Sequence, residues 1–170
     1  MSRAEHPKGT CSALRFAMRR GSPTFYSDPT KVATLKISVP PEDVVGPAER
    51  ILLLEDRDDF REVLCDHLAS RLFQVTSVPS GVEGLREIMK QAFDLIICDM
   101  MMPRMGGEMF YWAVTRVRPA TAQRFIFFTG HRNNPAIECF FRRVSATVLI
   151  KPFKLSALDA TIREVLRKLV

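Results

Sequence analysis

Five polar residues of this sequence stand directly after short apolar runs, at positions where parallel strands would end. They are Glu55, Asp56, Asp99, Thr129 and Lys151. Because the carboxyl ends of parallel strands meet at one edge of a sheet, we expect these side chains to converge there. Three converging carboxylates repel one another and oppose folding unless a cation lies between them. An all-oxygen set of ligands favours Mg²⁺ over zinc, which prefers histidine and cysteine.

A cation held by carboxylates, with a hydroxyl and an ammonium beside it, suits the transfer of a phosphoryl group. The cation and Lys151 would offset the charge on the phosphoryl oxygens, while Thr129 would donate a hydrogen bond to them. Asp99 ends the third predicted strand, at the centre of the sheet. Carboxylate nucleophiles that form aspartyl phosphates are an established chemical class, so we expect Asp99 to accept the phosphoryl group.

Five apolar runs alternate with helical patterns from Arg50 onward, which is typical of repeated strand–helix units. The runs are Ile51–Leu54, Phe73–Val78, Leu95–Cys98, Phe125–Phe128 and Thr147–Ile150. In the second run apolar and polar residues alternate, as expected at the edge of a sheet. The pattern predicts an α/β fold, with a doubly wound, five-stranded parallel sheet and helices on both faces.

Several predicted helices have recognisable ends. Ser80 with Glu83, and Ser156 with Asp159, have the spacing of a capping box, in which a hydroxyl caps the first turn and a carboxylate returns the bond. Two consecutive glycines are expected to separate the third strand from its helix, Tyr111–Val117.

The helix predicted over Ala136–Val144 carries more apolar residues than one buried stripe requires. These residues are Ile137, Phe140, Phe141 and Val144. We expect part of this set to form a surface for a partner protein or for a second copy of the chain.

Composition separates a proline-rich N-terminal segment from a globular domain. The chain has 170 residues, of which 46% are hydrophobic and 26% charged, with no apolar stretch long enough to span a membrane, so we expect a soluble, cytoplasmic protein. Residues 1–49 hold six of the eleven prolines and are expected to form a flexible extension, with a short basic amphipathic turn at Ala13–Arg20 and a short strand at Thr34–Val39. Residues 50–170 are expected to form the domain.

The charge balance and the cysteines argue against other classes of protein. The 25 Lys and Arg outnumber the 19 Asp and Glu, giving a net charge of +6, but the basic residues are scattered, so direct DNA binding is not expected. The four cysteines form no CxxC pair, and we expect reduced, structural thiols instead of a metal clip.

Four motifs, taken jointly, carry a resemblance to a known family. The motifs are ILLLEDRDDF, IICDMMMPRMGG, FFTG and LIKPF. In this order and spacing they resemble the receiver domain of bacterial two-component response regulators, the CheY-like family. The resemblance covers Arg50–Val170 and implies a flavodoxin-like fold with strand order 2-1-3-4-5. It also implies that a phosphohistidine, on a sensor histidine kinase or a histidine phosphotransfer protein, phosphorylates Asp99. Such a domain is not an enzyme, although it can remove its own phosphoryl group.

The resemblance also implies roles for individual residues. The magnesium ligands would be the carboxylates of Glu55, Asp56 and Asp99 and the backbone carbonyl of Met101. Thr129 would turn toward the phosphate, and Lys151 would pair with it, aimed by a cis Lys151–Pro152 bond. Met101 and His131 would flank the phosphate and tune the rate of its hydrolysis.

One position departs from the family's pattern. Receivers commonly carry Tyr or Phe three residues before the lysine, whereas this chain has Val148. We therefore expect phosphorylation to be read out by a shift of the Thr129 loop and the following helix, toward a downstream protein that the sequence does not identify. No residues follow the last helix for an output domain, so we expect the chain to act through a partner as a free-standing regulator, a phosphorelay intermediate or a remnant of a hybrid kinase. A possible homodimer would form through the fourth helix, fifth strand and fifth helix.

Two other functions fit the same residues. A scaffold with the receiver fold would keep the pocket but act through protein contacts without phosphorylation, and Val148 leaves that alternative open. An Mg²⁺-dependent phosphatase for small molecules usually needs a second acid two residues after its nucleophile, and Met101 stands there instead.

Overall fold

Five parallel strands form one sheet at the centre of the domain. The structure is a computed structural model that describes residues 49–131 and 134–169. The strands are β1 (Arg50–Leu54), β2 (Gln74–Val78), β3 (Leu95–Asp99), β4 (Phe125–Thr129) and β5 (Thr147–Ile150). Their order in the sheet is β2-β1-β3-β4-β5, which confirms the predicted topology. The segments predicted at Ala13–Arg20 and Thr34–Val39 lie outside the described residues.

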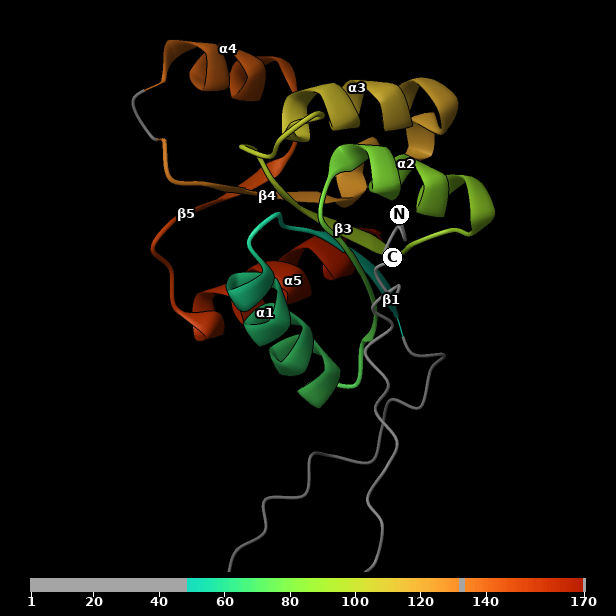
Figure 1. Ribbon diagram of the computed structural model, residues 1–170, viewed down its shortest axis with the longest axis vertical. Coiled ribbons are helices and arrows are strands. Elements are labelled where there is room, and N and C mark those ends of the chain that lie inside the picture. Colours follow the sequence, from blue (N-terminus) through green and yellow to red (C-terminus); the bar gives the residue numbers. More distant parts are fainter. Residues whose placement is uncertain (1–48, 132–133, 170) are drawn as a thin grey trace, which may run out of the picture. The chain divides into compact units, whose positions relative to one another are not determined.

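Helices cover both faces of the sheet, as predicted. They are α1 (Asp58–Ser70), α2 (Gly81–Lys90), α3 (Gly107–Val117), α4 (Pro135–Arg143) and α5 (Leu155–Leu169), with a 3₁₀ helix, η1, at Pro119–Arg124. Figure 1 shows α1 and α5 on one side of the sheet and α2, α3 and α4 on the other. No helix in the described ranges is long and apolar enough to cross a membrane.

The three central strands build two cores at once, because successive side chains of a strand point to opposite faces. Leu52 and Leu54 of β1 pack in the core beneath α2, α3 and α4, whereas Ile51 and Leu53 pack beneath α1 and α5. Strands β3 and β4 divide their residues in the same way, and all are buried. In β2, at the edge of the sheet, only Val78 is fully buried, which confirms the edge position expected from its alternating pattern.

One of the two predicted helix caps is present, although its carboxylate bonds the Ser80 hydroxyl and not the backbone amide as in a capping box. Ser80 precedes α2, accepts a hydrogen bond from the Val82 amide at 3.3 Å and donates one to Glu83. The prediction for Ser156 and Asp159 was wrong. Helix α5 begins at Leu155, so Ser156 lies inside it, and the buried Asp159 bonds His67 and Arg71 instead of the first turn.

Helix α3 begins at Gly107, four residues earlier than the sequence pattern predicted. A side chain at Gly107 would bring its Cβ within 2.7 Å of the Asp99 backbone carbonyl. Gly107 therefore does not break the helix. It allows the first turn of α3 to approach the end of β3 closely.

The apolar residues of α4 face the core. Ile137 and Phe140 are buried, and Phe141 and Val144 are partly buried against the same cluster. Phe141 and Val144 keep part of their surface exposed, so the expectation that part of this set forms a partner surface stays a prediction for these two residues. The set exceeds one helical stripe because Phe141 and Val144 pack at the margin of the core, where α4 ends.

Candidate functional site

The five polar residues predicted to converge lie at one edge of the sheet. Asp99 is the last residue of β3 and Thr129 the last residue of β4. Glu55 and Asp56 follow β1 directly, and Lys151 follows β5. Because the strands are parallel, each residue is placed by a strand whose apolar side chains are held in the two cores.

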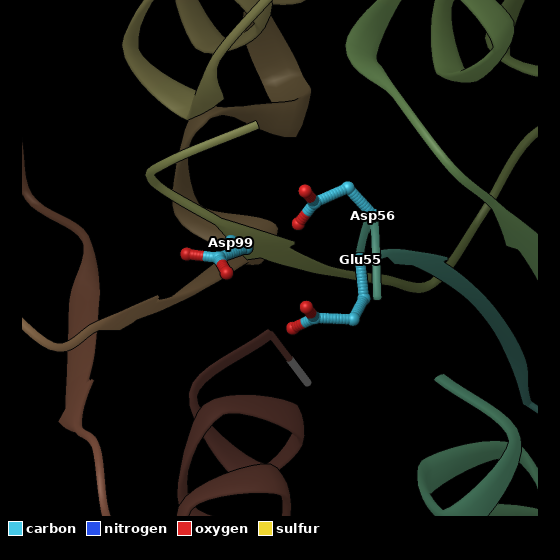
Figure 2. Close-up of side chains that lie close together, drawn as sticks. All are labelled: Glu55, Asp56 and Asp99. Atoms are coloured by element: carbon cyan, nitrogen blue, oxygen red, sulfur yellow. The ribbon is translucent and has the colours of Figure 1, made fainter. Parts of the chain in front are cut away.

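Three carboxylates form a cluster at this edge. One oxygen each from Glu55, Asp56 and Asp99 lies within 4.8 Å of the others. Figure 2 shows Glu55 and Asp56 extending from the end of β1 toward Asp99. Glu55 is fully buried and Asp99 nearly so, whereas Asp56 is half-buried. Such a set of hard oxygen ligands, partly open to solvent, suits a cation that keeps some of its water, as Mg²⁺ does.

The ammonium of Lys151 lies among these carboxylates. Its Nζ donates to Glu55 Oε2 at 2.8 Å and to Asp99 Oδ2 at 2.6 Å. Burial opposes the charge on Lys151, but the hydrogen bonds to Asp99 and Glu55 outweigh burial and raise the pKa of the lysine. Lys151 therefore remains a cation and offsets part of the negative charge of the cluster.

Glu55 is the carboxylate most affected by its surroundings. Burial raises the pKa of Glu55, and the negative charge of Asp99 adds to the effect, although the hydrogen bond from Lys151 opposes it. The guanidinium of Arg61 also donates to the backbone carbonyl of Glu55 at 2.8 Å. This bond ties the first helix to the loop that carries the acidic pair.

The loops after β3 and β4 bind the site residues through their backbones. The amide of Met101 donates to Asp99 Oδ1 at 3.1 Å, so both oxygens of Asp99 are engaged. The amide of His131 donates to Thr129 Oγ1 at 3.1 Å. No hydrogen bond among the described residues joins the Thr129 hydroxyl to the carboxylates. His131 is exposed, as expected of a loop residue, and the Lys151–Pro152 bond is cis, as expected.

Beside the acidic cluster runs an open groove of about 520 Å³, between α3 and the start of α4. Its exposed large apolar wall residues are Met101, Met109 and Trp112. Met101 thus belongs both to the loop of the phosphoacceptor candidate and to this groove.

Sequence reasoning missed the aromatic and guanidinium groups that support the site. Phe60 lies 4.9 Å, from ring centroid to Nζ, below Lys151, and Arg61 bonds Glu55. Both residues are in the first turn of α1, immediately after the acidic pair, where they resemble ordinary helix residues. Only the path of the chain from β1 into α1 reveals their roles.

Comparison with known proteins places these features in a family. The profile described as "Response regulator receiver domain" matches residues 51–163, which contain all five site residues. The chain belongs to this family. The receiver is therefore a domain of two-component signalling.

Two curated relatives show the range of proteins that contain such a receiver. The chain is 34% identical to the transcriptional activator protein PfeR of Pseudomonas aeruginosa, over 72% of this chain and 39% of PfeR. It is 31% identical to the probable chemotaxis protein CheY of Rhizobium etli, over 68% of this chain and 91% of that protein. The receiver thus spans less than half of PfeR but nearly all of the CheY relative.

A solved structure has the same fold. It is the receiver domain of the sensor histidine kinase PA1611 from Pseudomonas aeruginosa, 23% identical with a TM-score of 0.65, covering 71% of this chain and 98% of that one. That receiver has a magnesium ion coordinated in its active-site cleft.

Proposed function

We propose that this receiver accepts a phosphoryl group on Asp99 from a phosphohistidine of a sensor kinase or a histidine phosphotransfer protein. The observation that carries the proposal is the placement of Asp99, with Lys151 on one carboxylate oxygen and the Met101 amide on the other. One oxygen of Asp99 would attack phosphorus while the phosphorus–nitrogen bond of the donor breaks and the imidazole keeps the electron pair and is protonated.

The carboxylates of Glu55, Asp56 and Asp99, with the backbone carbonyl of Met101, would hold Mg²⁺. The donor set supports this ion because it contains oxygens only. A bound magnesium would offset charge on the phosphoryl oxygens. The ion in the cleft of the PA1611 receiver supports the same assignment by analogy.

Lys151 and Thr129 would stabilise the transferred group. The ammonium of Lys151 would move from the carboxylate oxygens to a phosphoryl oxygen, with which it can form a charge-assisted hydrogen bond. The Thr129 oxygen accepts a bond from the His131 amide, which leaves its hydroxyl hydrogen to donate to phosphate. Met101 and His131 would flank the group and tune its hydrolysis.

A scaffold that acts through protein contacts alone is the second candidate. The observation that favours it is Val148, since β5 lacks the aromatic residue that commonly moves when a receiver is phosphorylated. In such a scaffold, the acidic cluster would not take part in phosphoryl transfer.

Incubation with acetyl phosphate and Mg²⁺ separates the two candidates. We expect a hydroxylamine-labile phosphoryl adduct, detected by intact mass, in the wild type and in the control variant Asp66→Asn, whose carboxylate is exposed on α1. The adduct should be lost in Asp99→Asn and when magnesium is chelated. A wild type without an adduct would support the scaffold, and an adduct that persists in Asp99→Asn would refute the assignment of the acceptor.

A further inference from the structure

Aromatic rings lie beneath the ammonium of Lys151. Its Nζ is 4.9 Å from the ring centroid of Phe60 and 5.8 Å from that of Phe128. Both distances are within the roughly 6 Å over which a cation is attracted to the negative face of an aromatic ring. Lys151 therefore has two kinds of partner, the carboxylates on one side and the rings on the other.

Three phenylalanine rings from different parts of the chain pack against one another next to Lys151. They are Phe60, Phe128 and Phe153. Phe60 lies in the first turn of α1, Phe128 in β4, and Phe153 follows the Lys151–Pro152 bond. The centroid of Phe60 is 6.5 Å from that of Phe128 and 6.0 Å from that of Phe153, and the last two are 4.7 Å apart. Contacts with two neighbouring rings fix Phe60 in its place.

The carboxylates around Lys151 can also bind a divalent cation, whereas the aromatic rings cannot. Glu55 and Asp99, which accept the hydrogen bonds of Lys151, are also ligands of the proposed magnesium site. A divalent cation there would draw on the same oxygens and repel the ammonium. An aromatic face offers no hard oxygen and does not compete for such a cation. Among the described contacts of the Lys151 ammonium, those with the rings are independent of the acidic cluster.

We infer that Phe60 is a positioning residue for Lys151, whose ring keeps the ammonium beside Asp99 when the carboxylates are engaged elsewhere. Phe128 is fully buried in the core, so its packing role cannot be separated from its contact with the lysine. Phe60 is only partly buried, so a substitution there disturbs the core less than one at Phe128. The placement of Lys151 stands on the contacts alone, whereas the effect on phosphoryl transfer rests on the proposed function.

Three variants distinguish the effect of the aromatic ring from the effect of apolar side-chain volume. Phe60→Leu removes the ring but keeps an apolar side chain, and Phe60→Tyr restores a ring. Phe73→Leu is the matched control because Phe73 is also partly buried and packs against the same core cluster, with no contact to Lys151 recorded among the described residues. Urea unfolding should show that Phe60→Leu and Phe73→Leu lose comparable stability.

The first measurement detects the placement of Lys151 without any phosphodonor or metal. Protons above the face of a ring are shielded, so the side-chain NMR signals of Lys151, assigned by their loss in Lys151→Arg, should lie upfield. We expect the upfield shift to shrink in Phe60→Leu, where only the more distant Phe128 ring remains, and to persist in full in Phe60→Tyr and Phe73→Leu. Signals of Lys151 that are unchanged in Phe60→Leu would overturn the inference.

The second measurement is the rate at which acetyl phosphate phosphorylates Asp99 at saturating Mg²⁺. We expect Phe60→Leu to slow the reaction roughly two- to tenfold, with Phe60→Tyr and Phe73→Leu near the wild-type rate. The Mg²⁺ affinity should stay within about twofold in all of them, because Phe60 contributes no ligand. Equal slowing in Phe73→Leu, or none in Phe60→Leu, would refute the positioning role. A wild type that accepts no phosphoryl group would refute the proposed function instead, and the NMR comparison would still decide where Phe60 holds Lys151.

Discussion

Lys151 determines the charge balance of the acidic cluster. It bonds the fully buried Glu55 and the nearly buried Asp99, and its side chain is itself only 23% exposed. A buried carboxylate without such a partner is strongly unfavourable. In the absence of a bound cation, the lysine therefore offsets part of the negative charge that a metal ion would offset.

This role predicts a loss of stability in alkaline solution. The folded protein binds the Lys151 proton more tightly than the unfolded chain, because hydrogen bonds to Asp99 and Glu55 raise the pKa above its ordinary value of 10.5. The stabilisation is thus fully present below pH 10.5 and is lost as pH rises through the folded-state pKa. Wild type and Lys151→Gln should therefore approach each other in free energy of unfolding as the solution becomes strongly alkaline, measured by urea denaturation.

The exposed Lys154 supplies the control for this titration. Lys154→Gln should remain close to wild type at every pH. A difference between wild type and Lys151→Gln that stayed constant from neutral pH to above 10.5 would contradict the link between the lysine's proton and the fold.

At the scale of elements, the buried carboxylate of Asp159 joins the two helices that cover one face of the sheet. Asp159 of α5 is 8% exposed and bonds His67 of α1 at 2.7 Å and Arg71, just after α1, at 2.8 Å. Arg71 is 55% exposed, so solvent screens its share of the interaction. The contact with His67 is the more protected of the two.

We expect Asp159→Ala to lower the free energy of unfolding by about 2 kcal/mol, because it leaves the enclosed His67 without its partner. Arg71→Ala should cost less than about 1 kcal/mol, since it removes only the exposed half of the arrangement. Urea unfolding of both variants, with Asp66→Ala on the exposed side of α1 as control, tests this order. A larger loss in Arg71→Ala than in Asp159→Ala would reverse our ranking.

The close approach of α3 to β3 gives a second prediction for an element. Alanine ordinarily stabilises a helix relative to glycine by roughly 0.5–1 kcal/mol. In Gly107→Ala, however, the new Cβ would meet the Asp99 carbonyl at 2.7 Å and the Met100 Cα at 3.0 Å. We expect this variant to be destabilised by about 1–3 kcal/mol in urea unfolding, because backbone atoms must shift.

Gly130→Ala is the matched control, since the nearest atom to its new Cβ is Lys151 Cβ at 4.0 Å. Its free energy of unfolding should remain within about 0.5 kcal/mol of wild type. If both glycine variants were equally stable, the packing of α3 against the end of β3 would be looser than the structure indicates.

At the scale of the whole molecule, a cation that binds only the folded state must stabilise it. We expect Mg²⁺ to raise the free energy of unfolding by about 1.4 kcal/mol at tenfold the dissociation constant, and chelation to reverse the effect. The gain should be much smaller in Asp56→Asn, which removes a carboxylate of the cluster but leaves both bonds of Lys151 in place. Thermal unfolding of both proteins, with and without MgCl₂, measures this stabilisation.

Glu108→Gln serves as the control for this experiment, because Glu108 lies on α3 in the groove and not in the acidic cluster. It should gain as much from Mg²⁺ as wild type does. An equal gain in Asp56→Asn would show that the ion stabilises the protein at another place.

Sequence reasoning succeeded where local pattern and global fold agree. The five apolar runs predicted the strands because their apolar side chains pack in or against the two cores. The residues after them predicted the site because parallel strands share an edge. It failed where tertiary contacts override local spacing. Asp159 has the position of a capping carboxylate but pairs with a residue 92 positions away. Phe60 has no sequence signal for its contact with Lys151, because that contact joins the first helix to the end of the last strand.

Self-association through α4, β5 and α5 stays a prediction, which sedimentation of the protein with and without a phosphodonor can test. Ile137 and Phe140 of α4 offer it no support, since they are buried in the core, and Phe141 is partly exposed. The exposed residues of that helix are mostly polar and include Glu138, Cys139 and Arg142. An association there would depend on polar contacts and should weaken with salt.

The wall of the groove holds the one tryptophan of the chain. Trp112 is 44% exposed and stands edge-on to Phe140 of α4, with ring centroids 6.0 Å apart, while Met101 on the same groove is bonded to Asp99. An indole that is half in water changes its emission when its neighbours shift. The intrinsic fluorescence of Trp112 should therefore change when the acidic cluster binds a ligand or is modified. Because the chain has a single tryptophan, such a change can be assigned to this groove.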